Sequence, residues 1–216
     1  MKVVNIFCIL AKTGAGKTEY VNRILNDQQF MKENNLSLLV YGTTRSMREN
    51  EKEGIDYYYH SMEDYNKITN EELIESRSYY TLNDGEVYYF TKTEYFQKET
   101  NIICIASPYQ YESYKSWCTR ENIKGAKYNL NAIIINTDLK VRIDRLIKRA
   151  SKDEDIYEMC RRIIQERNEF DDVGKRILEI SNPDQSKNGC YVDNTLHDEL
   201  NKNIKKIKGF IRQSIK

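Results

Sequence analysis

The strongest constraint on the fold is an apolar segment that runs directly into a glycine-rich loop. Residues 3–10 read VVNIFCIL, and residues 11–18 read AKTGAGKT. A short β-branched run that ends at such a loop predicts a buried parallel strand. The apolar positions that follow recur at helical spacing, which predicts a helix over about residues 17–28. Strand, loop and helix in this order are the context in which a G-x-x-x-x-G-K-[ST] loop binds phosphate.

The loop carries the residue types that phosphate binding requires. Its glycines let the backbone turn N–H groups toward a phosphate, and the following helix adds the positive end of its dipole. Lys17 is expected to reach the β- and γ-phosphates, and Thr18 to hold Mg²⁺. The predicted ATP-binding residues of the loop are Gly14, Ala15, Gly16, Lys17 and Thr18.

One position of the loop departs from the pattern, because Ala11 stands where the first glycine is expected. That position starts the loop and is not among the residues that surround the β-phosphate. An alanine there costs little if its φ is negative, and about 1 kcal/mol if its φ is positive. We therefore expect the loop to bind phosphate.

The rest of the chain repeats the alternation of strand and helix. Further apolar runs predict strands at residues 36–41, 101–106, 131–136 and 189–192. Apolar stripes at helical spacing predict helices at residues 111–120, 139–147, 156–164 and 196–211. This order predicts an α/β fold, a five-stranded parallel sheet with helices on both faces.

Residues 43–98 interrupt that alternation, because they are rich in Arg, Glu and Tyr and lack long apolar periodicity. Within them YYTLNDGEVYYF (79–90) predicts a β-hairpin with its turn near residues 83–85. We therefore expect a core made of residues 1–42 and 99–216, and a small inserted subdomain at 43–98.

The composition narrows the possible partners. The chain has 34 basic and 33 acidic residues, so no strong field favours nucleic acid or an anionic membrane. No apolar run approaches the ~18 residues that a membrane span needs. Five scattered cysteines without a C-x-x-C pair are typical of a reducing cytosol. We expect a soluble cytoplasmic protein, monomeric or homodimeric, with small-molecule partners.

A second motif begins immediately after the predicted second strand. Residues 43–59 read TTRSMRENEKEGIDYYY and match T-T-R-x-x-R-x-x-E-x-x-G-x-D-Y at every position. In this motif the chain resembles the guanylate kinase family, P-loop enzymes that transfer the γ-phosphate of ATP to GMP. The resemblance covers nearly the whole chain and is weaker after residue 98. It implies that the sheet and its helices form a core of the P-loop kinase type, and that the insertion at 43–98 binds the acceptor nucleotide.

The resemblance implies a set of acceptor-binding residues. Arg45, Arg48 and Tyr57 would bind the phosphate of the acceptor. Glu75 would accept hydrogen bonds from the N1–H and amino groups of guanine, which adenine does not offer as a pair. Tyr89 and Thr91, in YYFT, would lie near the acceptor phosphate and base.

The same resemblance implies a short lid at about residues 148–157 and further groups for ATP. Arg145 and Asn194 would bind ATP, Asn194 at the adenine. Lys17, Arg149 and Arg162 would be catalytic, because cations neutralise the charge that spreads over the transferring phosphoryl group. ATP would be the co-substrate and Mg²⁺ the metal.

Three differences from the family pattern concern the acceptor. Ala106 and Pro108 stand where the family carries an acidic pair, Tyr41 replaces a serine that touches guanine, and Phe90 replaces the glycine of Y-Y-G-[ST]. The sequence therefore predicts a kinase of GMP or dGMP. A kinase of another phosphorylated acceptor on the same fold, and a non-catalytic guanylate-kinase-like binding module, remain alternatives. A plain P-loop ATPase is less favoured, because no acidic residue for activating water follows the third strand.

Overall fold

The computed structural model describes residues 3–81, 84–96, 99–151, 153–170, 189–195 and 199–216. Its central element is a five-stranded sheet in the order β2-β7-β1-β8-β9, in which all pairings are parallel. The strands are β1 (Val4–Ala11), β2 (Leu36–Leu38), β7 (Asn101–Ile105), β8 (Tyr128–Asn136) and β9 (Gly189–Asp193). Each lies where the apolar runs predicted a strand, so the predicted fold class is confirmed.

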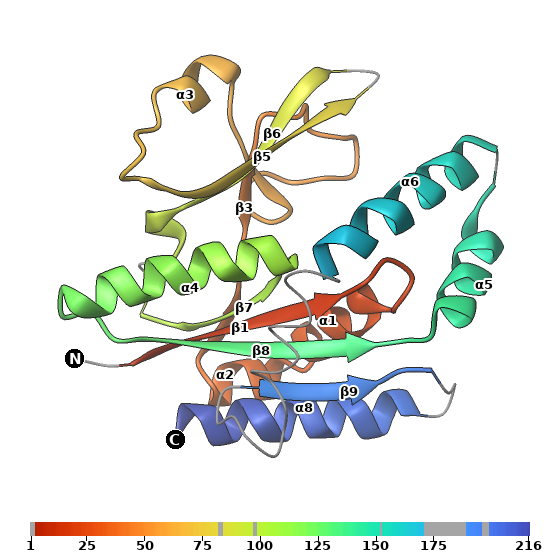
Figure 1. Ribbon diagram of the computed structural model, residues 1–216. Helices are drawn as coiled ribbons and strands as arrows, with labels where there is room; N and C mark the ends of the chain where they lie inside the picture. Colours follow the sequence, from red (N-terminus) through yellow and green to blue (C-terminus); the bar gives the residue numbers. More distant parts are fainter. Residues whose placement is uncertain (1–2, 82–83, 97–98, 152, 171–188, 196–198) are drawn as a thin grey trace.

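Helices cover both faces of this sheet, as Figure 1 shows. The helices in the described residues are α1 (Lys17–Leu25), α2 (Gln28–Glu33), α3 (Met62–Asn66), α4 (Pro108–Ile123), α5 (Leu139–Arg149), α6 (Asp153–Glu169) and α8 (Leu200–Ile215). Helices α1, α2 and α8 lie on one face and α4 lies on the other. In β1, Phe7 and Ile9 belong to the hydrophobic cluster on the side of α1 and α8, whereas Cys8 and Leu10 belong to the cluster on the side of α4. Both sets are fully buried, which explains why the strand is apolar at successive positions.

Several helix boundaries differ from the sequence prediction. Helices α4 and α6 extend at both ends beyond the predicted ranges of 111–120 and 156–164. The helix expected over residues 17–28 ends at Leu25, because Asp27 accepts a hydrogen bond from the Phe30 amide and starts the separate helix α2. The last helix was expected from residue 196, which lies outside the described residues. The described part of that helix is α8, and it begins at Leu200.

A second sheet of four strands, in the order β4-β3-β6-β5, stands beside the first. Its strands are β3 (Tyr41–Thr43), β4 (Tyr57–Tyr59), β5 (Leu73–Thr81) and β6 (Gly85–Lys92), and a 3-10 turn follows at Thr93–Tyr95. Strands β5 and β6 are antiparallel, as the hairpin prediction requires, although residue 83 of the predicted turn lies outside the described residues. The predicted strand 36–41 is divided between the two sheets, because β2 ends at Leu38 and Tyr41 begins β3, where it pairs with Tyr57 of β4.

Strand register separates the two faces of this second sheet. Phe90 pairs with Gly42 and Ser76, and its ring lies 5.1 Å from that of Tyr65 in α3. Helix α3 thus covers this outer face. The opposite, inner face carries the alternate residues of the same strands, namely Tyr41, Thr43, Tyr57, Tyr59, Glu75, Arg77, Tyr89 and Thr91. Apart from Arg45 and Arg48, the predicted acceptor-binding residues are the four on strands, and all four occupy this face: Tyr57, Glu75, Tyr89 and Thr91.

Candidate functional site

The phosphate loop follows β1 and leads into α1, as the sequence predicted. Gly14 and Gly16 have φ values of 80° and 92°, which side chains rarely adopt. A Cβ atom on Gly14 would also lie 2.8 Å from the Arg142 carbonyl oxygen, so the close approach excludes a side chain as well. Ala11 ends β1 in regular pairing with Ile135 and is not among the residues with positive φ. Its replacement of glycine therefore carries no left-handed strain.

The back of the loop is held by polar groups from β8, β9 and their following turns. The Asn194 amide donates to the Ala15 carbonyl oxygen at 2.9 Å, and the Thr137 hydroxyl donates to the same oxygen at 3.4 Å. Arg145 donates to the Asn194 carbonyl oxygen at 3.1 Å. Asn194 thus supports the loop in this structure, and its contact with adenine stays a prediction.

Lys17 is the first residue of α1, and its side chain turns back along the loop. Its ammonium donates to the Ala11 carbonyl oxygen at 2.6 Å. Burial lowers the pKa of Lys17, and the nearby negative charge of Glu166 opposes that shift. Thr18, the next residue, is exposed at the mouth of the loop. No cluster of three acidic, histidine or cysteine ligands occurs in the described part of the chain. A hydroxyl beside the loop suits Mg²⁺ that is held mainly by nucleotide phosphates.

The front of the loop is held by α6, a helix that the sequence predicted without indicating this contact. The Glu166 carboxylate accepts from the Thr13 amide at 2.7 and 2.8 Å and also from the Thr13 hydroxyl. Buried Arg142 donates to the Thr13 carbonyl oxygen at 3.0 Å and lies 3.8 Å from the Glu166 carboxylate. A carboxylate that accepts from a loop amide uses the same kind of donor that would bind a phosphate. The position of α6 is therefore tied to the phosphate loop.

Glu75 is the most informative residue on the inner face of the second sheet. Its Oε1 accepts from the Thr91 hydroxyl at 2.6 Å and from the Gln110 amide at 3.2 Å. Its Oε2 is buried and has no hydrogen-bond partner among the described residues. Burial raises the pKa of Glu75, and the bonds from Thr91 and Gln110 oppose that shift. A buried carboxylate oxygen without a donor is costly, so it requires an explanation.

The residues that depart from the family pattern have clear positions. Ser107 caps α4 and forms a capping box with Gln110, so Pro108 occupies the first helical turn and Gln110 reaches Glu75. The Tyr41 hydroxyl donates to the Ile105 carbonyl oxygen at 2.6 Å, at the end of β7. Phe90 points to the outer face and packs on Gly42, away from Glu75.

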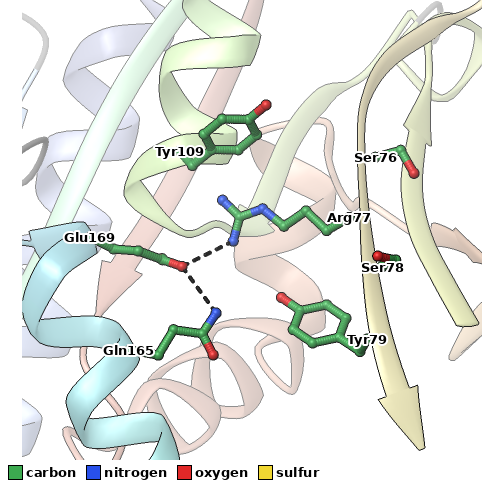
Figure 2. A pocket seen from close by; sticks show the side chains of 7 residues that line it. All are labelled: Ser76, Arg77, Ser78, Tyr79, Tyr109, Gln165 and Glu169. Atoms are coloured by element: carbon green, nitrogen blue, oxygen red, sulfur yellow. Dashed lines mark hydrogen bonds and ion pairs between the residues drawn. The ribbon is translucent and has the colours of Figure 1, made fainter. Parts of the chain in front are cut away.

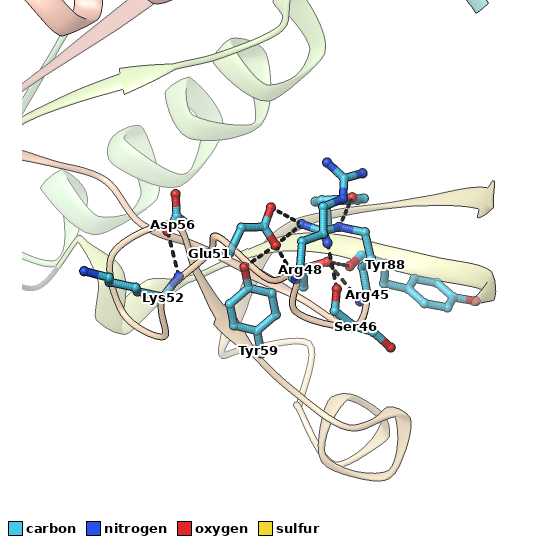
Figure 3. A network of polar contacts seen from close by, with 10 residues as sticks. Arg45, Ser46, Arg48, Glu51, Lys52, Asp56, Tyr59 and Tyr88 are labelled. Carbon is cyan, nitrogen blue, oxygen red and sulfur yellow. Dashed lines mark hydrogen bonds and ion pairs between the residues drawn. The ribbon is translucent and has the colours of Figure 1, made fainter. Parts of the chain in front are cut away.

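The two predicted phosphate-binding arginines differ in their exposure and in their side-chain contacts. Arg45 is buried and donates to both Glu51 oxygens at 2.7 and 2.9 Å and to the Tyr89 hydroxyl at 3.0 Å (Figure 3). Burial alone would lower the pKa of Arg45, but its bonds to Glu51 and Tyr89 raise it. Arg48 is exposed, and its hydrogen bonds among the described residues are made by the backbone: its amide donates to the Glu51 carboxylate, and its carbonyl oxygen accepts from the Glu51 amide. Tyr57 lies against the Tyr89 ring with centroids 5.6 Å apart.

The predicted lid arginines, Arg149 and Arg162, are both exposed. Arg149 ends α5 and is exposed. Arg162 forms an exposed ion pair with Glu158 at 2.7 Å within α6, yet its charge still lowers the pKa of Lys17. Arg162 thus acts on Lys17 through its charge, whereas Arg149 lies at the end of α5.

The amino-acid sequence was also compared with known proteins and protein families. No protein-family model matches the chain. A guanylate kinase of Pasteurella multocida is 35% identical over 69 residues, 32% of each chain, and one of Anaplasma phagocytophilum is 38% identical over 77 residues, 35% of each. These matches span only about a third of those relatives. A guanylate kinase of Mycoplasmoides gallisepticum is 25% identical over 207 residues, 95% of this chain and 91% of that protein.

The fold agrees with these similarities in sequence. A crystal structure of guanylate kinase from Anaplasma phagocytophilum superimposes with a TM-score of 0.51, 17% identity, and coverage of 99% of this chain and 87% of that chain. At this identity the likeness concerns the fold. None of the helices in the described residues is long and apolar enough to cross a membrane. Taken together, the comparisons show that this chain is similar to guanylate kinases in sequence and in fold.

Proposed function

We propose that this protein is a nucleoside monophosphate kinase that transfers the γ-phosphate of ATP to GMP or dGMP. The observation that carries the proposal is the buried Oε2 of Glu75, which lacks a donor among the described residues. Guanine offers an N1–H and an amino N–H side by side, and these would complete the hydrogen bonding of that carboxylate. Adenine presents a lone pair at N1, so the wrong base would leave Glu75 unpaired and buried.

The donor side of the proposed reaction uses the phosphate loop. The amides at the start of α1 would bind the phosphates of ATP, and Lys17 would exchange the Ala11 carbonyl oxygen for phosphate oxygens. Thr18 would hold Mg²⁺, which supplies charge neutralisation at the β- and γ-phosphates when it is bound with ATP. Arg149 and Arg162 would approach the transferring group from the lid.

The acceptor side uses the inner face of the second sheet. Arg48 is exposed, and among the described residues no hydrogen bond or ion pair occupies its guanidinium, which would bind the acceptor phosphate. Arg45 and Tyr89 are hydrogen-bonded to each other and would bind beside it. Tyr57 and Thr91 would line the phosphate and base ends. A phosphate monoester oxygen is already nucleophilic, so positioning and electrostatic stabilisation supply the rate acceleration.

A kinase of another phosphorylated acceptor is the second candidate, because Ala106 and Pro108 replace the acidic pair that the family resemblance leads one to expect. The Gln110 amide, in the same first turn of α4 as Pro108, donates to Glu75 instead. All five cysteines are free thiols, which supports a cytoplasmic site of action.

The test is release of ADP from ATP and Mg²⁺ with GMP, dGMP, AMP, CMP, UMP or no acceptor. We expect release that requires GMP or dGMP. The variant Glu75→Gln should lose guanine selectivity by about 1–3 kcal/mol, or about 5- to 150-fold in kcat/KM. Its matched control is Glu71→Gln, at an exposed carboxylate outside the inner face. An unchanged ranking of nucleotides in Glu75→Gln would show that Glu75 does not read the base.

A further inference from the structure

Arg77 is a charged residue on the inner face that the proposed site does not use. It lies two positions after Glu75 in β5 and pairs with Tyr89 of β6, so its side chain leaves the sheet on the same face. Its guanidinium lies 3.5 Å from the Glu169 carboxylate of α6 (Figure 2). It also lies over the Tyr109 ring of α4, 4.5 Å from the ring centroid.

This ion pair is different from the other ion pairs of the surface. The Arg77 and Glu169 side chains are only 17% and 25% exposed, so solvent screens their attraction less than it screens an exposed pair. The Tyr109 ring shields one side of the guanidinium and stabilises it by a cation–π contact. Beside the pair lies a cavity of about 390 Å³, between β5 and the end of α6.

The turn of α6 that carries Glu169 also contacts the phosphate loop. Glu166 precedes Glu169 by three residues, which places both on one side of the helix. Glu166 accepts from the Thr13 amide, and the Lys12 ammonium lies 5.4 Å from the Phe170 ring centroid just beyond the helix end. One helical turn therefore contacts the ATP loop through Glu166 and the acceptor sheet through Glu169.

We propose that Arg77 and Glu169 form a positioning pair that couples binding of the acceptor nucleotide to binding of ATP. Glu166 links α6 to the phosphate loop and Glu169 links α6 to the acceptor sheet, so a change in the loop on binding ATP is passed through α6 to that sheet. Coupling between two sites is reciprocal, so each nucleotide strengthens the binding of the other by the same factor. This inference rests on the proposed kinase function, and neither residue is assigned a contact with the reacting atoms.

The experiment measures GMP affinity by calorimetry, with and without a non-hydrolysable ATP analogue and Mg²⁺. For the wild-type protein we expect GMP to bind about 5- to 150-fold more tightly when the analogue is present. Arg77→Met keeps an unbranched chain against Tyr109 but removes the charge, and Glu169→Gln removes the opposite charge. Each should bring the coupling factor close to one while leaving GMP affinity without the analogue within about two-fold.

The double variant separates a pair from two independent residues. If the pair acts as one unit, Arg77→Met with Glu169→Gln has the coupling factor of either single variant. Three results would each overturn the proposal. The first is a loss of coupling in the double variant that equals the product of the two single losses. The second is coupling retained in Arg77→Met, and the third is GMP binding that is weakened equally with and without the analogue. The control is Lys92→Met, which breaks the ion pair of Lys92 with Glu94 on the same sheet and should leave coupling intact.

Failure of the inference differs from failure of the proposed function. A protein that binds GMP with the same affinity in both conditions has no coupling for the pair to transmit, which overturns the inference alone. A protein that binds the ATP analogue but no nucleoside monophosphate overturns the proposed function, and the inference with it. Thermal unfolding of each variant verifies that the fold is retained.

Discussion

The ammonium of Lys17 lies 2.6 Å from the carbonyl oxygen of Ala11, across the opening of the phosphate loop. This hydrogen bond holds the lysine in the loop before any phosphate arrives. A side chain that is already positioned loses less conformational entropy when it binds a ligand.

Lys17→Ala should therefore abolish phosphoryl transfer, with a loss of at least about 10²-fold in kcat, because a positioned cation at the transferring phosphate disappears. The readout is ADP release with GMP as acceptor. Lys124→Ala, at an exposed lysine of α4's end, is the control and should retain full activity. Near-normal turnover in Lys17→Ala would show that the phosphate loop is not part of the catalytic site.

Ala11→Gly restores the glycine that the loop pattern contains and should nevertheless weaken the protein. Ala11 is 2% exposed and lies in the central strand, so glycine there loses a buried methyl group and gains backbone freedom in the unfolded state. We expect a loss of about 1 kcal/mol in the free energy of unfolding, measured in urea, and turnover within about two-fold of wild type. A several-fold gain in turnover would mean that Ala11 does impair the loop.

Arg45 and Arg48 should give opposite results when each is replaced by alanine. Arg48→Ala should raise the KM for the acceptor and leave the melting temperature unchanged, because the side chain is exposed. Arg45→Ala should lower the free energy of unfolding by about 1–3 kcal/mol, because the Glu51 carboxylate loses its bidentate partner. Steady-state kinetics and thermal unfolding on both variants decide the matter, and an unchanged acceptor KM in Arg48→Ala would contradict its assignment.

The ion pair of Glu51 predicts a dependence of stability on pH. Burial opposes the charge of Glu51, but bonds from the Arg48 amide, Tyr59 and Arg45 outweigh it and lower the pKa from 4.5 to about 2. A lowered pKa contributes stability that is present above pH 4.5 and is lost as the pH falls from about 4.5 toward 2. Urea unfolding of wild type and Glu51→Gln should thus show a difference at pH 7 that shrinks at pH 3. A difference that stays constant would mean that Glu51 titrates normally.

The sequence predicted the parallel sheet because each of its strands is a local apolar run, and the phosphate loop because its motif is contiguous. It did not predict that residues 36–41 divide between two sheets, since both halves are equally apolar and only pairing partners distinguish them. Arg77 was missed although its place two residues after Glu75 puts it on the same strand face. Gln110 and Glu166 were missed because their partners lie 35 and 153 residues away in the chain. Contacts at such separation depend on packing that no local pattern records.

Successive residues of β6 face opposite sides of the second sheet, and this alternation limits which changes in the length of the strand the protein can tolerate. Phe90 belongs to the packing beneath α3, and the very next residue, Thr91, hydrogen-bonds to Glu75. An insertion or deletion of a single residue upstream in that strand would exchange these positions, with a phenyl ring facing Glu75 and a hydroxyl buried against Gly42. Point substitutions can therefore alter the selectivity of the inner face one residue at a time, whereas length changes within the strand would remove stability and substrate recognition together.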